Sequence, residues 1–445
     1  MRSKMAKVLH RAGGAYLLEH VIAAARAVAP VERITCVVGH QAERVRAAAA
    51  PLGVQFATQT EQLGTGHAVN ACRDLPQHAA GRIIVLYGDC PLLRGETIRG
   101  LYEHHLREGC AATLITTHLD DPTGYGRIYR DAEGRVVRIV EEKACRPEEK
   151  LLREINSGIY CFEAAALWPA LARLEPNPAS GEYYLTDIPE ILAAAGQKTA
   201  AYVVDDPHEI LGINTRVELA GADRILRGRR TRELMLAGVT IEQPETVRID
   251  PGVEIGMDTV IGPFVQLRGR TRIGEGCSVG SCAIIENSEI GDGAEVHPFT
   301  LICDSHLAAG ASVGPFARLR MGARVEEGAH AGNFVELKKT RLGAGSKAMH
   351  LAYLGDAEIG SGVNIGAGTI TCNYDGKRKH PTTIHDGAFV GSNSTLVAPV
   401  EIGAGSYVGA GSVITKPVPP DALGIGRGHQ YVKEGWAKHR REKQD

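Results

Sequence analysis

The chain has few aromatic residues, no excess of charge of either sign and no long apolar run. Only 5% of its 445 residues are Phe, Trp or Tyr, and 50 Lys and Arg stand against 52 Asp and Glu. Proteins that bind nucleic acid or membrane surfaces in general carry a basic excess, which is absent here. No run reaches the roughly 18 apolar residues that span a bilayer, and no apolar segment follows residues 1–7 as in a secretory signal. We therefore expect a cytoplasmic protein that binds neither nucleic acid nor membrane.

The cysteines form no C-x-x-C pair. Scattered cysteines in a chain without a secretory signal are typical of small buried hydrophobes in a reducing compartment, and neither a disulfide framework nor a zinc site is predicted. They stand at ten positions: Cys36, Cys72, Cys90, Cys110, Cys145, Cys161, Cys277, Cys282, Cys303 and Cys372.

Residues 1–214 alternate short apolar runs with amphipathic stretches. Residues 33–39 and 82–88 are β-branched runs closed by Gly, and residues 15–27 and 96–107 have helical spacing. This alternation predicts a doubly wound α/β domain with a mostly parallel sheet and ligands at the carboxyl ends of its strands. Residues 215–237 are predicted to form a helix that links this domain to the rest of the chain.

Residues 238–445 repeat an aliphatic residue followed by Gly at steps of six or twelve. A period of six fits neither a helix nor a simple strand, but it is typical of the hexapeptide repeat of a parallel β-helix. A narrow prism of this kind accepts Ile, Val and Leu better than rings, which agrees with the low aromatic content. Examples are Ile255-Gly256, Ile261-Gly262, Ile273-Gly274, Val279-Gly280, Ile359-Gly360 and Ile365-Gly366.

The repeat is interrupted at residues 333–340, 347–353 and 371–380, and insertions of this kind collect on the working face of a solenoid. The interruptions bring polar residues near cations, which suits a histidine base that acts while an anionic phosphate is held. The alternative is that the histidine only makes a structural hydrogen bond. The residues concerned are His350, Tyr353 and Asn373, with Arg320, Lys338 and Lys379.

The first half offers two further polar segments. Residues 59–68 form a glycine-punctuated loop before a helix, a place that favours bases and phosphates. Asp89 follows the apolar run 82–88, where a carboxylate can meet a metal bound to phosphates. A turn former or helix cap is the other interpretation of Asp89.

Both halves, in this order, resemble the bacterial bifunctional N-acetylglucosamine-1-phosphate uridyltransferase/glucosamine-1-phosphate acetyltransferase family. The resemblance implies an α/β nucleotidyltransferase domain (Rossmann-like, mostly parallel) followed by a left-handed parallel β-helix. It extends from about Met1 to Trp436 and rests on long motifs: Glu61-Gln-Leu-Gly-Thr-Gly-His67, Tyr87-Gly-Asp89, Asp121-Pro-Thr-Gly-Tyr-Gly-Arg127, Gly314-Pro-Phe-Ala-Arg-Leu-Arg320, Gly332-Asn-Phe-Val-Glu336 and Asn364-Ile-Gly-Ala-Gly-Thr-Ile-Thr-Cys-Asn-Tyr-Asp-Gly376.

For the β-helix, the resemblance implies N-acetylation of glucosamine 1-phosphate by acetyl-CoA at a site between neighbouring subunits of a homotrimer. His350 matches the catalytic base and Glu336 an acidic partner that orients it. The matches to the sugar-phosphate site are Arg320, Lys338, Tyr353, Asn364 and Lys379. The matches to the acetyl-CoA site are Ala367, Asn373, Tyr374, Ser392, Ala410 and Arg427.

For the first domain, the resemblance implies uridylyl transfer from UTP to N-acetylglucosamine 1-phosphate with release of pyrophosphate. Asp89 and Asn214 match the ligands of Mg²⁺, and Lys7 matches a phosphate-binding lysine. Gln59, Gly64 and Thr65 match contacts to uracil. The remaining matches to the UDP-sugar site are Tyr87, Gly88, Gly126, Glu141, Asn156 and Thr186.

The family opens with a strand and a glycine-rich nucleotide loop, and Met1 matches the last residue of that loop. We expect one further strand and loop, roughly 12 to 20 residues, upstream in the gene product. Two alternatives remain at this point: an acetyltransferase whose first domain is only a scaffold, or a β-helix of another class. The latter would be a non-catalytic trimeric binding module or a zinc hydratase using His297, His330, His350 or His385.

Overall fold

The structure, a computed structural model, describes residues 1–178 and 180–443. The chain divides into two compact units, Met1–Leu226 and Arg227–Asp445, with the division inside helix α7 (Arg216–Leu236). None of the helices in the described residues is long and apolar enough to cross a membrane. All ten cysteines are free, and six of them are buried, so the prediction that the cysteines are buried is confirmed for six.

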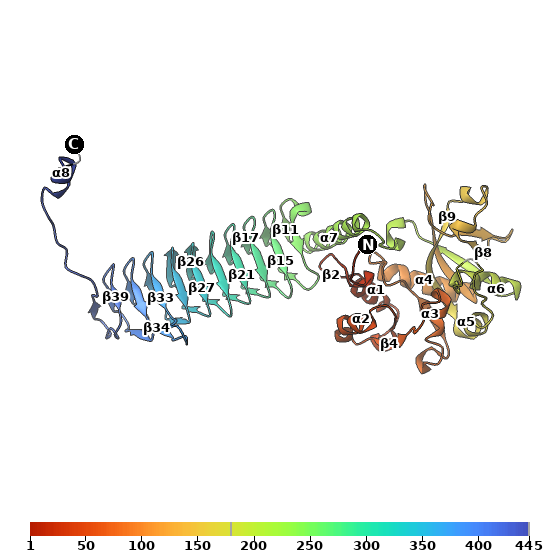
Figure 1. Cartoon of the computed structure of the whole chain (residues 1–445), viewed down its shortest axis with the longest axis horizontal. Coiled ribbons are helices and arrows are strands. Elements are labelled where there is room, and N and C mark those ends of the chain that lie inside the picture. The colour runs from red at the N-terminus through yellow and green to blue at the C-terminus, as the bar shows by residue number, and fades with distance from the viewer. Residues whose placement is uncertain (179, 444–445) are drawn as a thin grey trace. The chain divides into compact units, whose positions relative to one another are not determined.

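The first unit is an α/β domain (red to green in Figure 1). Its helices are α1 (Leu17–Ala25), α2 (Ala42–Ala49), α3 (Thr65–Asn70), α4 (Gly95–Glu108), α5 (Ala164–Leu171) and α6 (Ile188–Ala194). Its strands are β1 (Arg11–Ala12), β2 (Ala15–Tyr16), β3 (Thr35–Val38), β4 (Gln55–Thr58), β5 (Arg82–Val85), β6 (Ala112–His118), β7 (Arg127–Arg130), β8 (Val136–Val140), β9 (Glu154–Glu163) and β10 (Thr199–Val203).

The main sheet of this unit is mixed, whereas the sequence predicts a mostly parallel one. Its order is β10-β6-β9-β7-β8, with β5 also paired to β9. β9 runs antiparallel to β5, β6 and β7, while β10 runs parallel to β6 and β3 parallel to β4. The apolar run of β9 shows that both of its faces are buried but contains no information on its direction, which the sheet decides.

An apolar slot of about 540 Å³ lies between β3 and β5. Thr35, Cys36 and Val37 line it from one sheet, and Ile83, Ile84 and Val85 line it from the other. In the described residues β3 is paired only with β4 and β5 only with β9, so each has an open edge.

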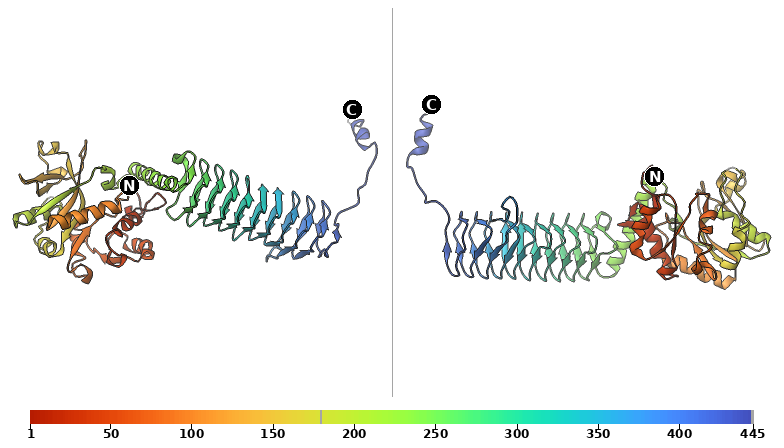
Figure 2. Two further views of the ribbon diagram at one scale, coloured as in Figure 1. Left: turned by 180° about the vertical axis from the view of Figure 1, so that it is seen from behind. Right: turned by 60° about the horizontal axis from the view of Figure 1, so that its bottom comes forward.

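The second unit is a regular stack of coils, and Figure 2 shows the stack in two further views. Three parallel sheets form its faces in the described residues. The first face contains β11 (Thr240–Ile241), β14 (Val260–Ile261), β17 (Ser278–Val279), β20 (Glu295–Val296), β23 (Ser312–Val313), β26 (His330–Asn333), β29 (Lys347–His350), β32 (Asn364–Ile365), β35 (Phe389–Val390), β38 (Tyr407–Val408) and β40 (Leu423–Gly424).

The two other faces follow the first along each coil. The second contains β12 (Arg248–Ile249), β15 (Gln266–Arg268), β18 (Ile284–Glu286), β21 (Leu301–Cys303), β24 (Arg318–Arg320), β27 (Glu336–Lys338), β30 (Tyr353–Gly355), β33 (Ile370–Cys372), β36 (Thr395–Val397) and β39 (Val413–Ile414). The third contains β13 (Glu254–Ile255), β16 (Arg272–Ile273), β19 (Glu289–Ile290), β22 (His306–Leu307), β25 (Arg324–Val325), β28 (Arg341–Leu342), β31 (Ala357–Ile359), β34 (Thr382–Ile384) and β37 (Val400–Ile402).

The core of the stack is a set of aliphatic ladders in strict register. On the second face Leu319, Leu337 and Leu354 are fully buried and occupy the same position in successive coils. Each strand contributes alternate residues to the inside, so the flanking residues point outward. The predicted parallel β-helix is therefore confirmed, and a residue's place on the outer surface follows from its register.

Candidate functional site

A single corner of the β-helix places the predicted base next to a run of small residues. Asn333 pairs in register with His350, and the following coils have Ala367, Ser392 and Ala410 at the same corner. The backbone links these coils: Asn393 N donates to Ala367 O at 2.7 Å and Gly411 N to Ser392 O at 2.8 Å. We call these five residues the corner column. After His350 it has no bulky side chain for three coils, which leaves a path along the stack.

His350 is exposed at the end of β29 and has a defined partner. Its Nδ1 lies 2.5 Å from Oδ1 of Asn333. Because an amide oxygen only accepts, Nδ1 carries the hydrogen, and in the neutral imidazole the lone pair of the base is then on Nε2. Asn333 is not among the predicted site residues, although a register of one coil, 17 residues, connects it to His350.

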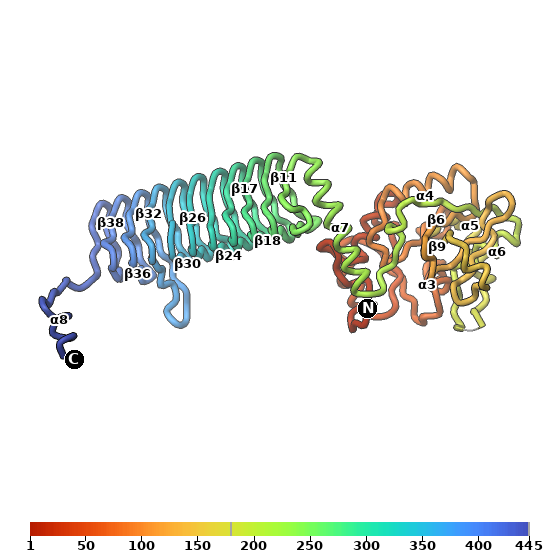
Figure 3. Tube along the Cα trace, turned by 90° about the horizontal axis from the view of Figure 1, so that it is seen from above, coloured from red at the N-terminus to blue at the C-terminus, as the bar shows by residue number. Residues whose placement is uncertain are grey.

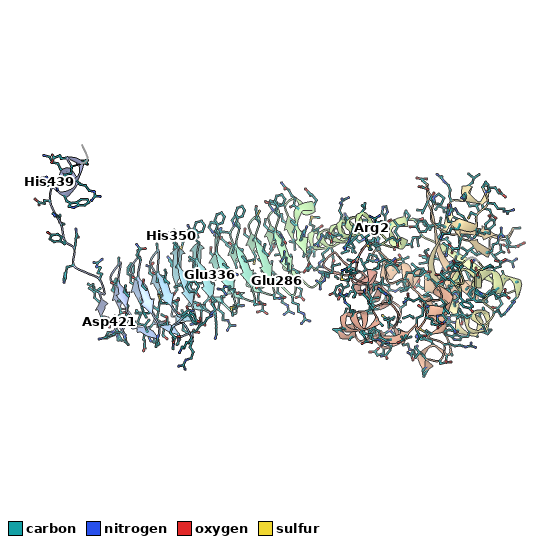
Figure 4. All side chains as sticks on the ribbon, viewed as in Figure 1. Arg2, Glu286, Glu336, His350, Asp421 and His439 are labelled. Atoms are coloured by element: carbon teal, nitrogen blue, oxygen red, sulfur yellow. The ribbon has the colours of Figure 1, made fainter. Side chains whose placement is uncertain are left out.

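The second face carries the predicted cations and Glu336. Arg320, Lys338 and Gly355 share one register position, and Glu336 pairs with Tyr353. Arg320 Nε donates to Glu336 Oε1 at 2.6 Å. The partner that the structure gives to Glu336 is thus Arg320, while that of His350 is Asn333. Figure 4 labels His350 and Glu336 on the same stretch of the stack.

Lys338 is buried beneath the insertion at residues 373–381, which projects from the stack near β30 and β36 in Figure 3. Its Nζ donates to Asp356 Oδ2 at 2.7 Å, and Asn373 Nδ2 donates to the same oxygen at 2.5 Å. Burial is the largest single influence on the pKa of Lys338 and lowers it, but the hydrogen bonds to Asp356 and Lys379 and the charge of Asp356 together raise the pKa. The pKa of Lys379 is lowered because Lys338 lies beside it.

Tyr353 and Asn373 meet above Gly355, where a side chain cannot fit. A Cβ on Gly355 would lie 2.5 Å from Tyr353 Oη and 2.7 Å from Asn373 Nδ2. The glycine therefore lets the tyrosine and the insertion close over the cations of the second face. Tyr374 is exposed on the insertion, where its hydroxyl donates to Gly376 O at 2.7 Å.

Asn364 is the one predicted sugar-phosphate residue that lies apart from the others. It begins β32 on the first face, whereas Arg320, Lys338 and Tyr353 lie on the second. Outward side chains on two faces of a prism point in different directions, so a single chain does not direct Asn364 toward the cations. Arg427 lies past the last coil, where its Nη1 donates to Ala410 O at 2.6 Å.

An exposed apolar ridge runs beside the corner column. It consists of Phe264, Phe299, Phe316, Phe334 and Leu351, each of them about half exposed. The rings of Phe299 and Phe316 stack with their centroids 4.9 Å apart, and those of Phe316 and Phe334 stack with their centroids 5.2 Å apart. Exposed apolar patches of this extent on soluble proteins mark interaction surfaces.

In the α/β unit, Asp89 and Asn214 converge on one cation. Lys7 Nζ forms an ion pair with Asp89 Oδ2 and donates to Asn214 Oδ1 at 2.9 Å. Two oxygen donors directed at one positive charge fit Mg²⁺, which takes few protein oxygens and completes its shell with phosphate and water. In the part of the chain that the structure describes, no three His, Cys, Asp or Glu side chains gather as a metal site.

Tyr87 lies at the centre of the remaining predicted residues. Burial, together with the negative charges of Glu141 and Asp89, raises the pKa of Tyr87 to about 12, and the phenol also hydrogen-bonds Thr65. Its ring packs against Gly158, where an added Cβ would meet it. Tyr87 belongs to a predicted motif, but the motif contains no information on its proximity to Thr65, Glu141 and Gly158.

The other predicted UDP-sugar residues are held by contacts to the protein. Gln59 Nε2 donates to Gly64 O at 3.0 Å, and Thr65 Oγ1 accepts from Leu185 N at 3.0 Å. Gly64 has a φ of +99°, and a Cβ there would lie 2.6 Å from Tyr183 O, so only glycine fits. The Thr186 hydroxyl is buried without a partner among the described residues, which leaves it free to bind a ligand.

The rest of this set borders the same region. Asn156 Nδ2 donates to Tyr160 Oη at 2.9 Å, and its Oδ1 accepts from Gly158 N at 3.1 Å. A Cβ on Gly126 would lie 3.7 Å from Glu141 Oε1, and one on Gly88 would lie 3.3 Å from Val8. Gly126 therefore lies beside Glu141, whereas Gly88 packs against Leu18 and Val8.

Two family models match the chain. The MobA-like NTP transferase domain matches residues 1–185, and the bacterial transferase hexapeptide (six repeats) matches residues 252–287 and 381–416. These matches confirm the nucleotidyltransferase fold of the first half and the hexapeptide repeat of the second.

Curated relatives match over nearly their full length. "Bifunctional protein GlmU" of Solibacter usitatus is 60% identical over 442 residues, covering 99% of this chain and 95% of the relative. The proteins of the same name from Koribacter versatilis and Trichlorobacter lovleyi are 52% and 48% identical, covering 100% and 99% of this chain and 95% and 96% of the relatives. The chain therefore belongs to the GlmU family, the bacterial bifunctional N-acetylglucosamine-1-phosphate uridyltransferases/glucosamine-1-phosphate acetyltransferases.

Proposed function

We propose that the two reactions of this bifunctional enzyme of UDP-N-acetylglucosamine synthesis are divided between the two halves of the chain. Residues 238–445 N-acetylate glucosamine 1-phosphate, residues 1–214 transfer uridylyl from UTP to the product, and residues 215–237 link them. The observation that carries this division is the corner column, in which a histidine base adjoins small residues at the corner that precedes the face carrying Arg320 and Lys338. The acetyltransferase-only alternative is not favoured, because the relatives are named bifunctional and an NTP transferase model matches the first half.

In the acetyl transfer, His350 acts as the general base. Its Nε2 accepts a proton from the amine of glucosamine 1-phosphate as the nitrogen attacks the thioester carbonyl of acetyl-CoA. A C–N bond forms, the C–S bond breaks, and coenzyme A leaves as a thiol after protonation. Asn333 holds the ring by Nδ1 throughout, and Glu336 holds the Arg320 guanidinium in place.

The substrates of this reaction lie on two sides of His350. Arg320, Lys338 and Lys379 attract the sugar phosphate, and Tyr353 and Asn364 contact the sugar. Acetyl-CoA lies along Ala367, Ser392 and Ala410, with Asn373, Tyr374 and Arg427 as polar contacts. Because successive coils are about 4.8 Å apart, the small residues offer an extended path that suits a long, thin cofactor.

In the uridylyl transfer, an oxygen of the N-acetylglucosamine 1-phosphate attacks the α-phosphorus of UTP and pyrophosphate leaves. Bound Mg²⁺, held by Asp89 and Asn214, supplies charge neutralisation and orientation of the phosphates. Lys7 adds a positive charge at the same point, while Gln59, Gly64 and Thr65 hold uracil. Tyr87, Gly88, Gly126, Glu141, Asn156 and Thr186 hold the sugar, so this site acts mainly by positioning.

We further propose that the enzyme is a homotrimer and acts in the cytoplasm. The apolar ridge beside the corner column is unpartnered in a single chain, and its burial by a second copy supports an oligomer. A neighbouring chain can also supply Asn364 from its own first face, which the isolated chain holds apart from the cations. The ten free thiols fit a reducing compartment.

The test is a split assay on the full chain with one variant for each site. His350→Ala is expected to lower thiol release from acetyl-CoA by roughly 100- to 10,000-fold, the usual worth of a general base, with pyrophosphate release from UTP unchanged. Asp89→Ala is expected to give the opposite result. Loss of both activities in both variants, or full acetyl transfer by His350→Ala, would contradict the division.

A further inference from the structure

Asp356 lies between the two substrate subsites without belonging to the residues predicted for either. It follows β30 at a corner, and its side chain is 12% exposed. Its backbone is held on both sides, because its N donates to Lys338 O at 2.9 Å and its O accepts from Thr382 N at 3.2 Å. These two hydrogen bonds fix the backbone from which the Asp356 side chain extends.

One oxygen of this carboxylate serves both subsites. Oδ2 accepts from Lys338 Nζ at 2.7 Å and from Asn373 Nδ2 at 2.5 Å. Lys338 is one of the phosphate-binding cations, and Asn373 is a polar contact of acetyl-CoA on the insertion. Since Lys338 is 3% exposed, its ammonium has few alternative positions once the carboxylate holds it.

The corner by itself does not require this aspartate to be charged. Asp356 has a φ of +50°, and Asp304 has a φ of +46° at the equivalent turn after β21. Asn is tolerated in this backbone conformation as well as Asp. Asp304 is exposed and lies outside the site, so the two positions share a turn and differ in what the carboxylate contacts.

We propose that Asp356 is a positioning residue that couples the two subsites, holding the Lys338 ammonium for the sugar phosphate and the Asn373 amide for acetyl-CoA through one carboxylate oxygen. The proposal rests on the proposed acetyltransferase site. Both donors already meet this oxygen in the single chain, so one carboxylate prepares the two subsites together.

Asp356→Asn distinguishes positioning from simple electrostatics. Removal of a negative charge beside Lys338 and Lys379 would by itself strengthen the binding of anionic substrates and lower KM. Loss of positioning acts in the opposite direction. We expect KM for glucosamine 1-phosphate and for acetyl-CoA each to rise roughly tenfold, as for one lost charge-assisted hydrogen bond, with a smaller change in kcat.

Asp304→Asn is the matched control, with far-UV circular dichroism as a measure of intact folding of the β-helix in every variant. It is expected to leave both KM values unchanged. If Asp356→Asn behaves like Asp304→Asn, lowers KM, or raises only one of the two values, the coupling is overturned. Lys338→Ala separates this from the proposed function: if it leaves KM for glucosamine 1-phosphate unchanged, the phosphate site itself is wrong.

A double variant tests the shared oxygen directly. If Asp356 acts on acetyl-CoA through Asn373, Asp356→Asn adds nothing to the acetyl-CoA KM of Asn373→Ala. Effects that multiply in the double variant would overturn this route. This comparison does not depend on the absolute size of either effect.

Discussion

The two units achieve a packed interior in different ways. In the β-helix three ladders pair coil to coil, and its aliphatic core is continuous. In the α/β unit an apolar slot of about 540 Å³ separates the sheet of β3 and β4 from the edge of β5 in the main sheet. The repeat thus determines packing and site position together, whereas the α/β unit assembles its site from Lys7, Asp89 and Asn214, which are far apart in sequence.

The largest expected difference between the units is in the cost of removing core volume. Leu337→Ala, at a fully buried position of the β-helix, is expected to destabilise that unit by about 2–5 kcal/mol. Ile84→Ala, on the wall of the slot, is expected to cost less, because part of its surroundings is already empty. Urea unfolding followed by far-UV circular dichroism and by fluorescence of the buried Trp168 measures both; equal losses would contradict the comparison.

A larger side chain should destabilise the β-helix but not the α/β unit, and the change in the free energy of unfolding should be smaller than for removed volume. Ala331→Leu, inside the β-helix, is expected to cost about 1–3 kcal/mol because nothing there can move aside. Ala25→Leu, from a helix that lines the slot, is expected to be neutral or stabilising. The same unfolding measurement decides, and a clear loss of stability in Ala25→Leu would show that the slot is not available space.

The smallest expected effect is a difference in pH dependence. Burial lowers the pKa values of His10, His78 and His105 in the α/β unit below 6.5. Below pH 6.5 the unfolded chain therefore binds more protons than the folded chain. The contribution of these neutral, buried histidines to the free energy of unfolding is complete above that pH and is lost as the pH falls toward their lowered pKa values.

We therefore expect the Tm of the α/β unit to fall between pH 7 and about 5, before that of the β-helix. The assay is thermal unfolding with Trp168 fluorescence as the signal for the α/β unit. His105→Asn, which removes one of the buried imidazoles, should flatten the slope. A Tm of the α/β unit that does not change over this pH range would contradict the attribution of its pH dependence to the buried histidines.

Much of the β-helix could be predicted because its repeat is a periodic pattern of residues in the sequence. The aliphatic-Gly period placed Ile261, Val279 and Ile359 inside, where the structure buries them, and the interruptions located the insertion that carries Asn373 and Lys379. Asn333 was missed because an amide at a regular corner has no composition signal. Asp356 was missed for the same reason, since an aspartate after a strand is typical of a turn.

The α/β unit was predicted less completely. Its alternation of apolar runs and helices indicated the fold class, but a buried strand such as β9 has the same pattern whether it runs parallel or antiparallel. The hydrogen bond of Tyr87 to Thr65 and the effect of the Glu141 and Asp89 charges on it could not be predicted from its motif, because these residues come together only when separate segments pack.

The sequence by itself determined the two architectures, the aliphatic core and the residue types available for phosphate and base chemistry, because periodicity and composition are local properties. Only the tertiary structure decided which of these side chains share a hydrogen bond. His350 pairs with Asn333, Glu336 with Arg320, and Lys338 with Asn373 through Asp356. The physical reason is that such a bond requires atoms within about 3 Å, and the register of coils and sheets, rather than sequence spacing alone, brings them there.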